Sequence, residues 1–390
     1  MKELKIQDLF QISKGKKVEQ VANDSKDKIR YIQIEDLRNN ETIKYCKNDN
    51  KYIYASKDDI IIAWDGANAG TIGYNIEGVI GSTLAVLKRK NNNFAFNTAY
   101  VAKFMQSKTR FLRDNCTGAT IPHISRKVLE NLNVPLPSMD VQNKIVILLD
   151  KVQSLIDKRK AQITTLSDLT HSVFLEMFGD PSSNKYNFNK VKIGDVIYTL
   201  EAGLSTGGEN RKKEAGEYGV LTTSAVTYGE FRPESYKVPT KNINDSKKII
   251  HPTKNSILVS RMNTTELVGA SCIVEDDYYD LFIPDRLWKL TLKTHIVNPY
   301  YFVSAIQHKY FRKKLSQEAT GTSGSMLNIS QSKFKKMELI LPSLEQQNKF
   351  VSILNEISIN KKLLVKSLTK LENNLNSLMH QAFKGELFND

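Results

Sequence analysis

The chain has 390 residues, 40% of them hydrophobic, and a formal net charge of +14 with a pI of about 9.3. Its length can bury two or three hydrophobic cores, and its charge indicates a polyanionic partner, most commonly nucleic acid. A lysine-rich surface without such a partner is the alternative. The three cysteines lie far apart, which argues against a disulfide framework or a zinc site and favours a reducing, cytoplasmic location. No signal peptide or membrane-spanning run is expected.

The segment from Ile6 to Val134 has the pattern of a β-rich domain. Polar loops with glycine or asparagine separate its short apolar runs, and a helix is predicted to begin at the N-cap Asn97. The loop Thr117–Ser125 then leads to a short helix and a last strand. Branched and aromatic residues predict strands at Tyr31–Ile34, Tyr52–Tyr54, Ile60–Trp64, Thr71–Tyr74 and Leu84–Leu87.

Two long helices are predicted by a stretch that occurs twice. Pro137 and Pro342, Gln142 and Gln347, and Phe178 and Phe383 are each 205 positions apart. A serine follows each proline as an N-cap, and Ser343 with Gln346 fits a capping box. About forty residues without an interior proline or glycine make a helix of roughly 60 Å.

Each long helix carries one apolar seam at heptad spacing, which a helix on its own cannot bury. We expect the two copies to pair as an antiparallel coiled coil; two independent amphipathic helices on separate cores are the alternative. Leu155 and Leu169 are expected on this seam. So are the positions chosen to represent it: Ile145, Val152, Leu166, Ile357, Leu364 and Leu371.

The segment from about Asn187 to Ile340 repeats the plan of the first. Gly179–Asn184 breaks the first helix and links the halves. Ile193 corresponds to Ile6 at an offset of 187 residues, and Asn298 corresponds to Asn97 at an offset of 201. Ile257 is expected to correspond to Ile61, at an offset of 196. The offset grows only between strands, so the loops have changed length within a common framework, as expected where loops carry specificity.

Motifs for catalysis are missing. Asn298-Pro299-Tyr300 approaches the catalytic Asn-Pro-Pro-aromatic loop of adenine methyltransferases but lacks its second proline. An asparagine N-cap followed by proline explains it better. There is no P-loop, no Gly-rich dinucleotide motif and no metal-ligand spacing among the six histidines. We therefore expect a protein that is not itself an enzyme and that binds neither a metal nor a cofactor.

The candidate DNA contacts are basic and polar side chains in the loops. Lysines can neutralise phosphates, while amides, hydroxyls and arginine can bind base edges. A solvated surface is the alternative for any one of them. The set comprises Lys14, Lys16, Lys17, Asn68, Thr117, Thr120 and His123 in the first half, and Ser205, Thr223, Ser224, Tyr228, Arg261, Asn263, Thr264, Thr322 and Ser323 in the second.

The order domain, helix, domain, helix resembles the specificity subunit of type I restriction–modification enzymes over essentially the whole chain. The resemblance is strongest at Gly118–Ser125, Pro135–Pro137 with Gln142, and Phe174–Pro181. In the second half it lies at Leu221–Gly229 and Arg261–Gly269.

The resemblance implies an α+β fold in four parts: a target-recognition domain at 1–137, a spacer helix with linker at 138–180, a second recognition domain at 181–341, and a second helix with tail at 342–390. Each domain would read half of a split DNA target. The helices would dock two modification subunits, which bring S-adenosylmethionine and methylate adenine N6, and restriction subunits that cleave DNA could join them. An interaction scaffold whose basic charge is incidental is the rival interpretation.

Overall fold

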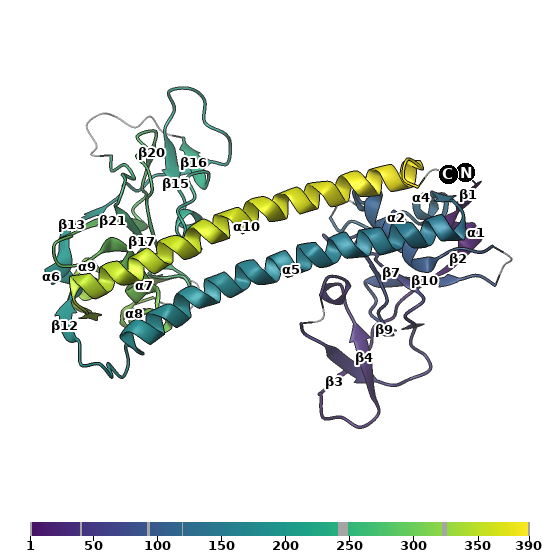
Figure 1. The fold of residues 1–390 in the computed structure, drawn as a ribbon, viewed down its shortest axis with the longest axis horizontal. Helices are drawn as coiled ribbons and strands as arrows, with labels where there is room; N and C mark the ends of the chain where they lie inside the picture. The colour runs from purple at the N-terminus through teal and green to yellow at the C-terminus, as the bar shows by residue number, and fades with distance from the viewer. Residues whose placement is uncertain are drawn as a thin grey trace. The chain divides into compact units, whose positions relative to one another are not determined.

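The computed structural model describes residues 2–39, 41–91, 94–118, 120–240, 249–321 and 326–388 (Figure 1). The chain forms two compact units. Unit 1 contains Met1–Gln162 and Leu364–Asp390, and unit 2 contains Ile163–Leu363. Each unit therefore takes part of both long helices, so the units cut across the predicted domain boundaries, which stay a prediction.

In unit 1, the central sheet has the strand order β2-β10-β7-β8, and a second sheet has the order β3-β5-β4-β9-β6. Strand β1 pairs antiparallel with β11, so the start of the domain lies beside its end. The elements are β1 (Lys2–Lys5), α1 (Ile6–Leu9), β2 (Phe10–Lys14), β3 (Gln20–Val21), β4 (Lys28–Ile32), η1 (Glu35–Leu37), β5 (Lys44–Lys47), β6 (Tyr54–Ala55), β7 (Ile60–Ala63), β8 (Ile72–Tyr74), β9 (Gly78–Ile80), β10 (Leu84–Arg89), α2 (Thr98–Ser107), α3 (Thr109–Asp114), α4 (Arg126–Glu130) and β11 (Asn133–Leu136).

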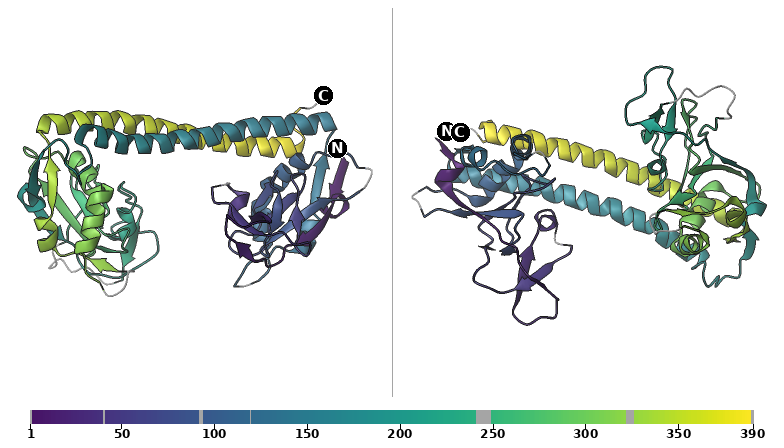
Figure 2. Two further views of the ribbon diagram at one scale, coloured as in Figure 1. Left: turned by 90° about the horizontal axis from the view of Figure 1, so that it is seen from below. Right: turned by 180° about the vertical axis from the view of Figure 1, so that it is seen from behind.

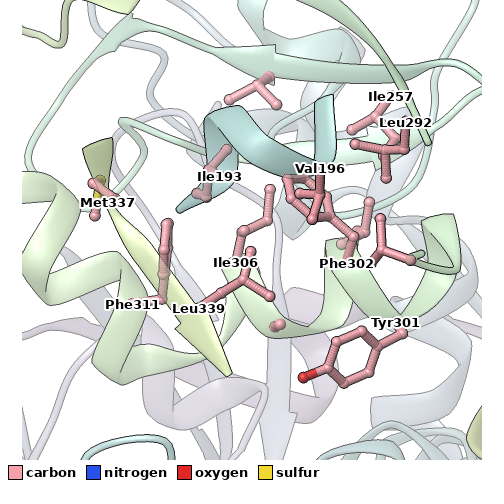
Figure 3. Close-up of a cluster of buried hydrophobic side chains, with 14 of the residues drawn as sticks. Ile193, Val196, Ile257, Leu292, Tyr301, Phe302, Ile306, Phe311, Met337 and Leu339 are labelled. Atoms are coloured by element: carbon pink, nitrogen blue, oxygen red, sulfur yellow. The ribbon is translucent and has the colours of Figure 1, made fainter. Parts of the chain in front are cut away.

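Unit 2 repeats this plan with a central sheet of order β13-β21-β17-β19, a second sheet of order β14-β16-β15-β20, and the pair β12-β23. Figure 3 shows part of its core, where α6, α7, α8 and β23 contribute side chains to one cluster. The elements are β12 (Asn189–Lys192), α6 (Ile193–Val196), β13 (Ile197–Ala202), β14 (Gly208–Glu209), β15 (Gly219–Leu221), η2 (Thr223–Ala225), β16 (Tyr236–Pro239), β17 (Ile257–Ser260), β18 (Met262–Asn263), β19 (Ser271–Ile273), β20 (Leu281–Phe282), β21 (Leu287–Leu292), α7 (Pro299–Gln307), α8 (Lys309–Glu318), β22 (Leu327–Asn328), α9 (Gln331–Lys336) and β23 (Glu338–Leu341).

The long helices are α5 (Met139–Phe178) and α10 (Leu344–Lys384). In unit 1, the start of α5 packs with the end of α10, because Ile145 and Ala382 share one core. In unit 2, the end of α5 packs with the start of α10, because Phe174 and Phe350 share another. The helices therefore run antiparallel (Figure 2), which confirms the predicted α+β fold and the predicted pairing.

The helix ends follow the sequence signals. Ser343 and Gln346 form the predicted capping box through reciprocal hydrogen bonds. Gly179, at φ +72°, follows the last residue of α5 and adopts a backbone conformation that side chains disfavour. Asn298 caps α7 with Pro299 at its first position, as the sequence predicted.

Burial along the apolar seam is uneven, and Ile156 in the middle of α5 is buried as well. Ile145 and Ile357 are buried, while Val152, Leu166, Leu364 and Leu371 are half-buried. Leu155 and Leu169 are exposed, so the expectation that they lie on the seam is wrong. Two helices cover only part of each other's surface, so heptad spacing overestimates burial along the seam.

Each domain is joined to the start of its following helix by the same hydrogen bonds. The Gln142 side chain accepts from the Asn97 backbone N–H at 2.8 Å and donates to the Pro137 carbonyl at 2.9 Å. Gln347 does the same with Asn298 and Pro342, at 2.8 and 2.9 Å. The two domains therefore share their framework at the level of single hydrogen bonds.

Replacing Gln347 by leucine is expected to lower the free energy of unfolding by about 2–4 kcal/mol, because the half-buried backbone N–H of Asn298 and the buried carbonyl of Pro342 lose their partner. Urea unfolding measures the change. Lys349→Leu, on an exposed position of the same helix, is the control and should cost under about 1 kcal/mol. Equal losses in the two variants would contradict the role of the glutamine.

One predicted correspondence between the domains is wrong by one residue. In unit 1, Ile60 pairs with Leu87, and in unit 2, Ile257 pairs with Leu290 at the same place in the sheet. Ile257 therefore corresponds to Ile60 and not to Ile61, and the offset is 197. The cores agree, since Ile60 and Ile257 face the main core of their units. A run of three apolar residues cannot fix its own register, whereas the sheet can, because a slip of one residue exchanges its two faces.

The predicted strands are present, with shifted ends. Strand β4 ends at Ile32 rather than Ile34, and β6 covers only Tyr54–Ala55. Trp64 and Thr71 lie just outside β7 and β8, in the loop between them. Part of this loop belongs to the candidate site.

Candidate nucleic-acid interface

In unit 1, loops from four parts of the chain meet at one end of the central sheet. They follow β2, η1, β7 and α3. The β7–β8 loop is the common partner: the Gly66 N–H donates to the Pro122 carbonyl at 2.9 Å, and the Asn68 side chain accepts from Arg38. Thr117 and His123 pair through backbone hydrogen bonds of 2.7 and 2.8 Å. Predicted site residues from distant parts of the chain are thus brought together.

Three ionisable side chains form a linear network at this place. Asp65 accepts from Lys14 at 2.8 Å through one carboxylate oxygen and contacts His123 Nδ1 at 2.6 Å through the other. Burial raises the pKa of the Asp65 carboxyl, but the hydrogen bonds and charges of Lys14 and His123 outweigh it, so that the pKa is lowered overall. Lys14 and His123 remain about half exposed at 49% and 46%, so both can also contact a ligand.

Because the pKa of Asp65 is lowered by folding, its contacts stabilise the protein above the unfolded-state pKa of about 4. That stabilisation is lost as the pH falls through the lower folded-state value. Asp65→Asn is therefore expected to be less stable than the wild type at pH 7, with the difference shrinking below about pH 4. Urea midpoints of both proteins between pH 7 and pH 3 measure this. A difference that grows as the pH falls would contradict the assignment.

The lysines after β2 follow Gly15, where the backbone passes very close to the backbone of Ile80 and Gly81. A Cβ on Gly15 would lie 2.2 Å from the Gly81 carbonyl oxygen, so only glycine fits there. Lys16 and Lys17 follow and are exposed. In unit 2, a Cβ on Gly203 would lie 2.1 Å from the Ile283 carbonyl oxygen, and Ser205 follows Gly203 at the same interval as Lys17 follows Gly15.

In unit 2, the loop after β17 pairs with the segment after α8. Strands β18 and β22 bring Asn263 opposite Leu327 and Met262 opposite Asn328. Asn263 donates to Ser260 Oγ at 3.4 Å, and its side chain accepts from the Thr264 N–H at 2.9 Å. Arg261, Asn263 and Thr264 therefore lie together, as their spacing in the sequence suggested.

A second group of predicted residues lies on a different part of unit 2. Thr223 and Ser224 belong to η2, and Tyr228 follows with its ring against Arg232 at 4.0 Å. The same turn reaches the long helix, where Glu230 pairs with Lys361 at 3.1 Å. In the part of the chain that the structure describes, no hydrogen bond or ion pair joins Thr223, Ser224 or Tyr228 to Arg261.

Three further residues belong to these sites and were not chosen from the sequence. Arg38 holds Asn68, Asp65 joins Lys14 to His123, and Asn328 occupies the position of His123 in unit 2. Asp65 directly follows a predicted strand, which could have drawn attention to it. Thr120 is exposed in its loop. Thr322 and Ser323 lie outside the described residues.

The described residues contain no group of three or more histidine, cysteine, aspartate or glutamate side chains that could hold a metal ion. Over the same residues, no helix has the length and apolar character to cross a membrane. The loops of the candidate interface present charged and hydrogen-bonding side chains.

A family model described as the type I restriction modification DNA specificity domain matches residues 1–165 and 185–373. The MjaVIII specificity subunit of Methanocaldococcus jannaschii is 24% identical, covering 98% of this chain and 92% of that protein. The EcoKI specificity subunit of Escherichia coli K12 is 22% identical, covering 85% and 75%.

Two solved structures have similar folds. The S subunit of a type I restriction–modification system from M. genitalium superposes with a TM-score of 0.56 at 16% identity, covering 98% of this chain and 96% of that one. A chain from a study of complex assembly and conformational transition in the type I system gives 0.59 at 15% identity, covering 99% and 98%. At these identities the likeness is one of fold.

Proposed function

Because the chain belongs to the family of type I restriction modification DNA specificity domains, we propose that it binds double-stranded DNA at a two-part target, one part read by each unit. The observation that carries this proposal is the duplicated frame of loops. Each central sheet ends in loops from the same three parts of the domain, those after β2, β7 and α3 in unit 1 and those after β13, β17 and α8 in unit 2. Equivalent backbone hydrogen bonds hold them, such as that from Ile124 to Trp64 in unit 1 and that from Ile329 to Arg261 in unit 2. Two equivalent binding surfaces in one chain suit a target in two parts.

The two surfaces carry different side chains, which supports two different half-sites. Unit 1 presents Lys14, Asp65 and His123, whereas unit 2 presents Arg261 and Asn263. Lysines contribute mainly to binding the phosphate backbone, while arginine and asparagine pair with the acceptor and donor groups of base edges in the major groove.

We further propose that α5 and α10 dock two modification subunits, which supply S-adenosylmethionine and methylate adenine N6. The present chain would then act as a recognition subunit without catalysis of its own, and restriction subunits could join the complex. Exposed apolar side chains on the long helices support a protein partner there, since such residues leave water when they are covered. They include Ile147, Ile359 and Leu363, at 68%, 61% and 60% exposure.

Filter binding of the full chain to a random-sequence duplex at several salt concentrations tests the DNA-binding function. A DNA reader should lose affinity linearly on a plot of log affinity against log salt. A flat plot or no binding would instead favour the rival function, an interaction scaffold whose basic charge is incidental.

The double variant Lys16→Ala, Lys17→Ala is expected to weaken binding to every sequence alike and to reduce the salt slope by about 1.8, which corresponds to two phosphate contacts. The same filter assay measures it. Lys57→Ala with Lys90→Ala removes the same charge from exposed positions outside the interface and is the control. Equal slopes for both double variants would contradict the phosphate contacts at Lys16 and Lys17.

A further inference from the structure

The two units have the same backbone framework, and at some of its positions they carry different side chains. Two framework positions carry the same residue in both units: Asn97 and Asn298 cap equivalent helices, and Tyr100 and Tyr301 donate to the carbonyls of Pro135 and Ile340 at 2.8 and 2.7 Å. Other framework positions differ, such as Ile62 and Val259 in the central sheets, so a difference between the units is informative only at the candidate interface.

His123 and Asn328 occupy one position of this frame. The His123 backbone exchanges hydrogen bonds with Thr117 at 2.7 and 2.8 Å, and the Asn328 backbone exchanges them with Thr320 at 2.9 Å in both directions. The next residue along also matches, since the Ile124 N–H donates to the Trp64 carbonyl and the Ile329 N–H to the Arg261 carbonyl. The backbone at this position is therefore the same in both units.

The side chains that surround this position in unit 1 all differ from those at the equivalent positions in unit 2. Lys14 pairs with Ala85 in its sheet, and Ala202 pairs with Trp288 at the matching place. Asp65 lies opposite His123, and Met262 lies opposite Asn328. Unit 1 thus carries the ionisable side chains Lys14, Asp65 and His123 where unit 2 carries Ala202, Met262 and Asn328, none of which ionises.

Unit 2 also has unpaired polar atoms at this position. Among the described residues, Asn328 Oδ1 and Arg261 Nε are buried without a hydrogen-bond partner. Buried polar atoms in folded proteins nearly always have a partner, so a ligand or an ordered water that reached these two atoms would satisfy them.

We infer that this position reads one base pair in each half-site, through Asn328 with Arg261 in unit 2 and through His123 with Lys14 in unit 1, and that the two base pairs differ. This inference rests on the proposed function and names residues that determine its specificity. An asparagine amide can both donate to and accept from a base edge, whereas lysine can only donate. Asp65 acts here as a positioning residue, since it holds both Lys14 and His123.

Selection of bound sequences from a library of random duplexes tests the inference, with the full chain purified together with its modification subunits. The wild type should enrich two blocks of fixed bases separated by unread bases. Asn328→Asp, which keeps the side-chain shape but removes the donor, should change the preference at one base pair of one block by about 5- to 150-fold. His123→Asn is the matched variant in unit 1 and should change only the other block.

The triple variant Ala202→Lys, Met262→Asp, Asn328→His places the unit 1 set on the unit 2 frame. It should give that base pair of the unit 2 block the preference found in the unit 1 block. If Asn328→Asp were to unfold, as seen in its melting curve, Asn328→Ser and this triple variant provide the same readout.

Wild-type blocks that stay unchanged in folded Asn328 variants would overturn the inference while leaving the proposed function intact. Changes spread over both blocks would overturn it as well. A wild type that enriches no blocks at all would instead count against the proposed function itself.

Discussion

Inserting seven residues after Gln162 and another seven after Leu363 is expected to lengthen the unread stretch between the two half-sites by about three base pairs, because a heptad adds about 10.5 Å of helix and each base pair about 3.4 Å of duplex. The insertion points lie where the two compact units divide both helices, so the contacts within each unit are kept. Seven residues also restore the apolar seam to the same face of each helix. Mapping of methylated bases in a strain that carries the variant measures the spacer.

Three base pairs also rotate the second half-site by about 100° around the duplex, so the single heptad is expected to bind less tightly than the wild type. Insertion of three heptads adds about 31 Å, close to one turn of DNA, and should recover affinity for a target with about nine more unread base pairs. Seven residues inserted in α5 alone are the control, since they displace one seam relative to the other. An unchanged spacer in the double insertion would refute the idea that helix length sets the spacing.

Truncation of Phe178 to alanine is expected to lower the free energy of unfolding of unit 2 by about 3–5 kcal/mol, as for other buried phenylalanines. The ring is fully buried and lies 5.0 Å from Tyr301 and 5.3 Å from Phe350, measured between ring centroids. These rings come from α5, α7 and α10, so Phe178 packs the end of the first long helix against the core of unit 2. Amide hydrogen exchange locates the loss, because lowered protection should be confined to unit 2.

The matched variant is Phe383→Ala, at the equivalent position of α10 in unit 1. Phe383 packs on Tyr100 and Phe104 at centroid distances of 5.5 and 5.3 Å but is only half-buried. A smaller loss is therefore expected, confined to unit 1. Loss of protection in both units from either variant would contradict the assignment of each ring to one unit.

The predictions from the sequence are confirmed at the helix ends and are partly wrong along the apolar seam, and this difference has a physical reason. Helix ends depend on neighbours along the chain, so the capping box at Ser343, the N-caps at Asn97 and Asn298, and the break at Gly179 agree with prediction. The seam was less well predicted at Leu155 and Leu169, because two paired helices cover only part of each other's surface: Leu155 is exposed while its neighbour Ile156 is buried.

The candidate site shows the same division. Arg261, Asn263 and Thr264 are neighbours in sequence and could be grouped from it, whereas the contact of Lys14 with His123 through Asp65 joins three separate loops. Asn328 could also have been chosen from the sequence, because the offset of 205 that relates the long helices also relates His123 to Asn328, and the hydrogen bonds in both units confirm that correspondence.

The sequence by itself determined that the chain is duplicated, that two long helices follow two β-rich domains, and which loops are basic, because spacing, caps and charge are properties of the chain in one dimension. Only the tertiary structure decided the register between the two sheets and the side chains that share a surface. Both depend on pairing between segments far apart in the chain. A hydrogen-bonded sheet distinguishes an offset of 196 from one of 197, whereas a run of similar apolar residues does not.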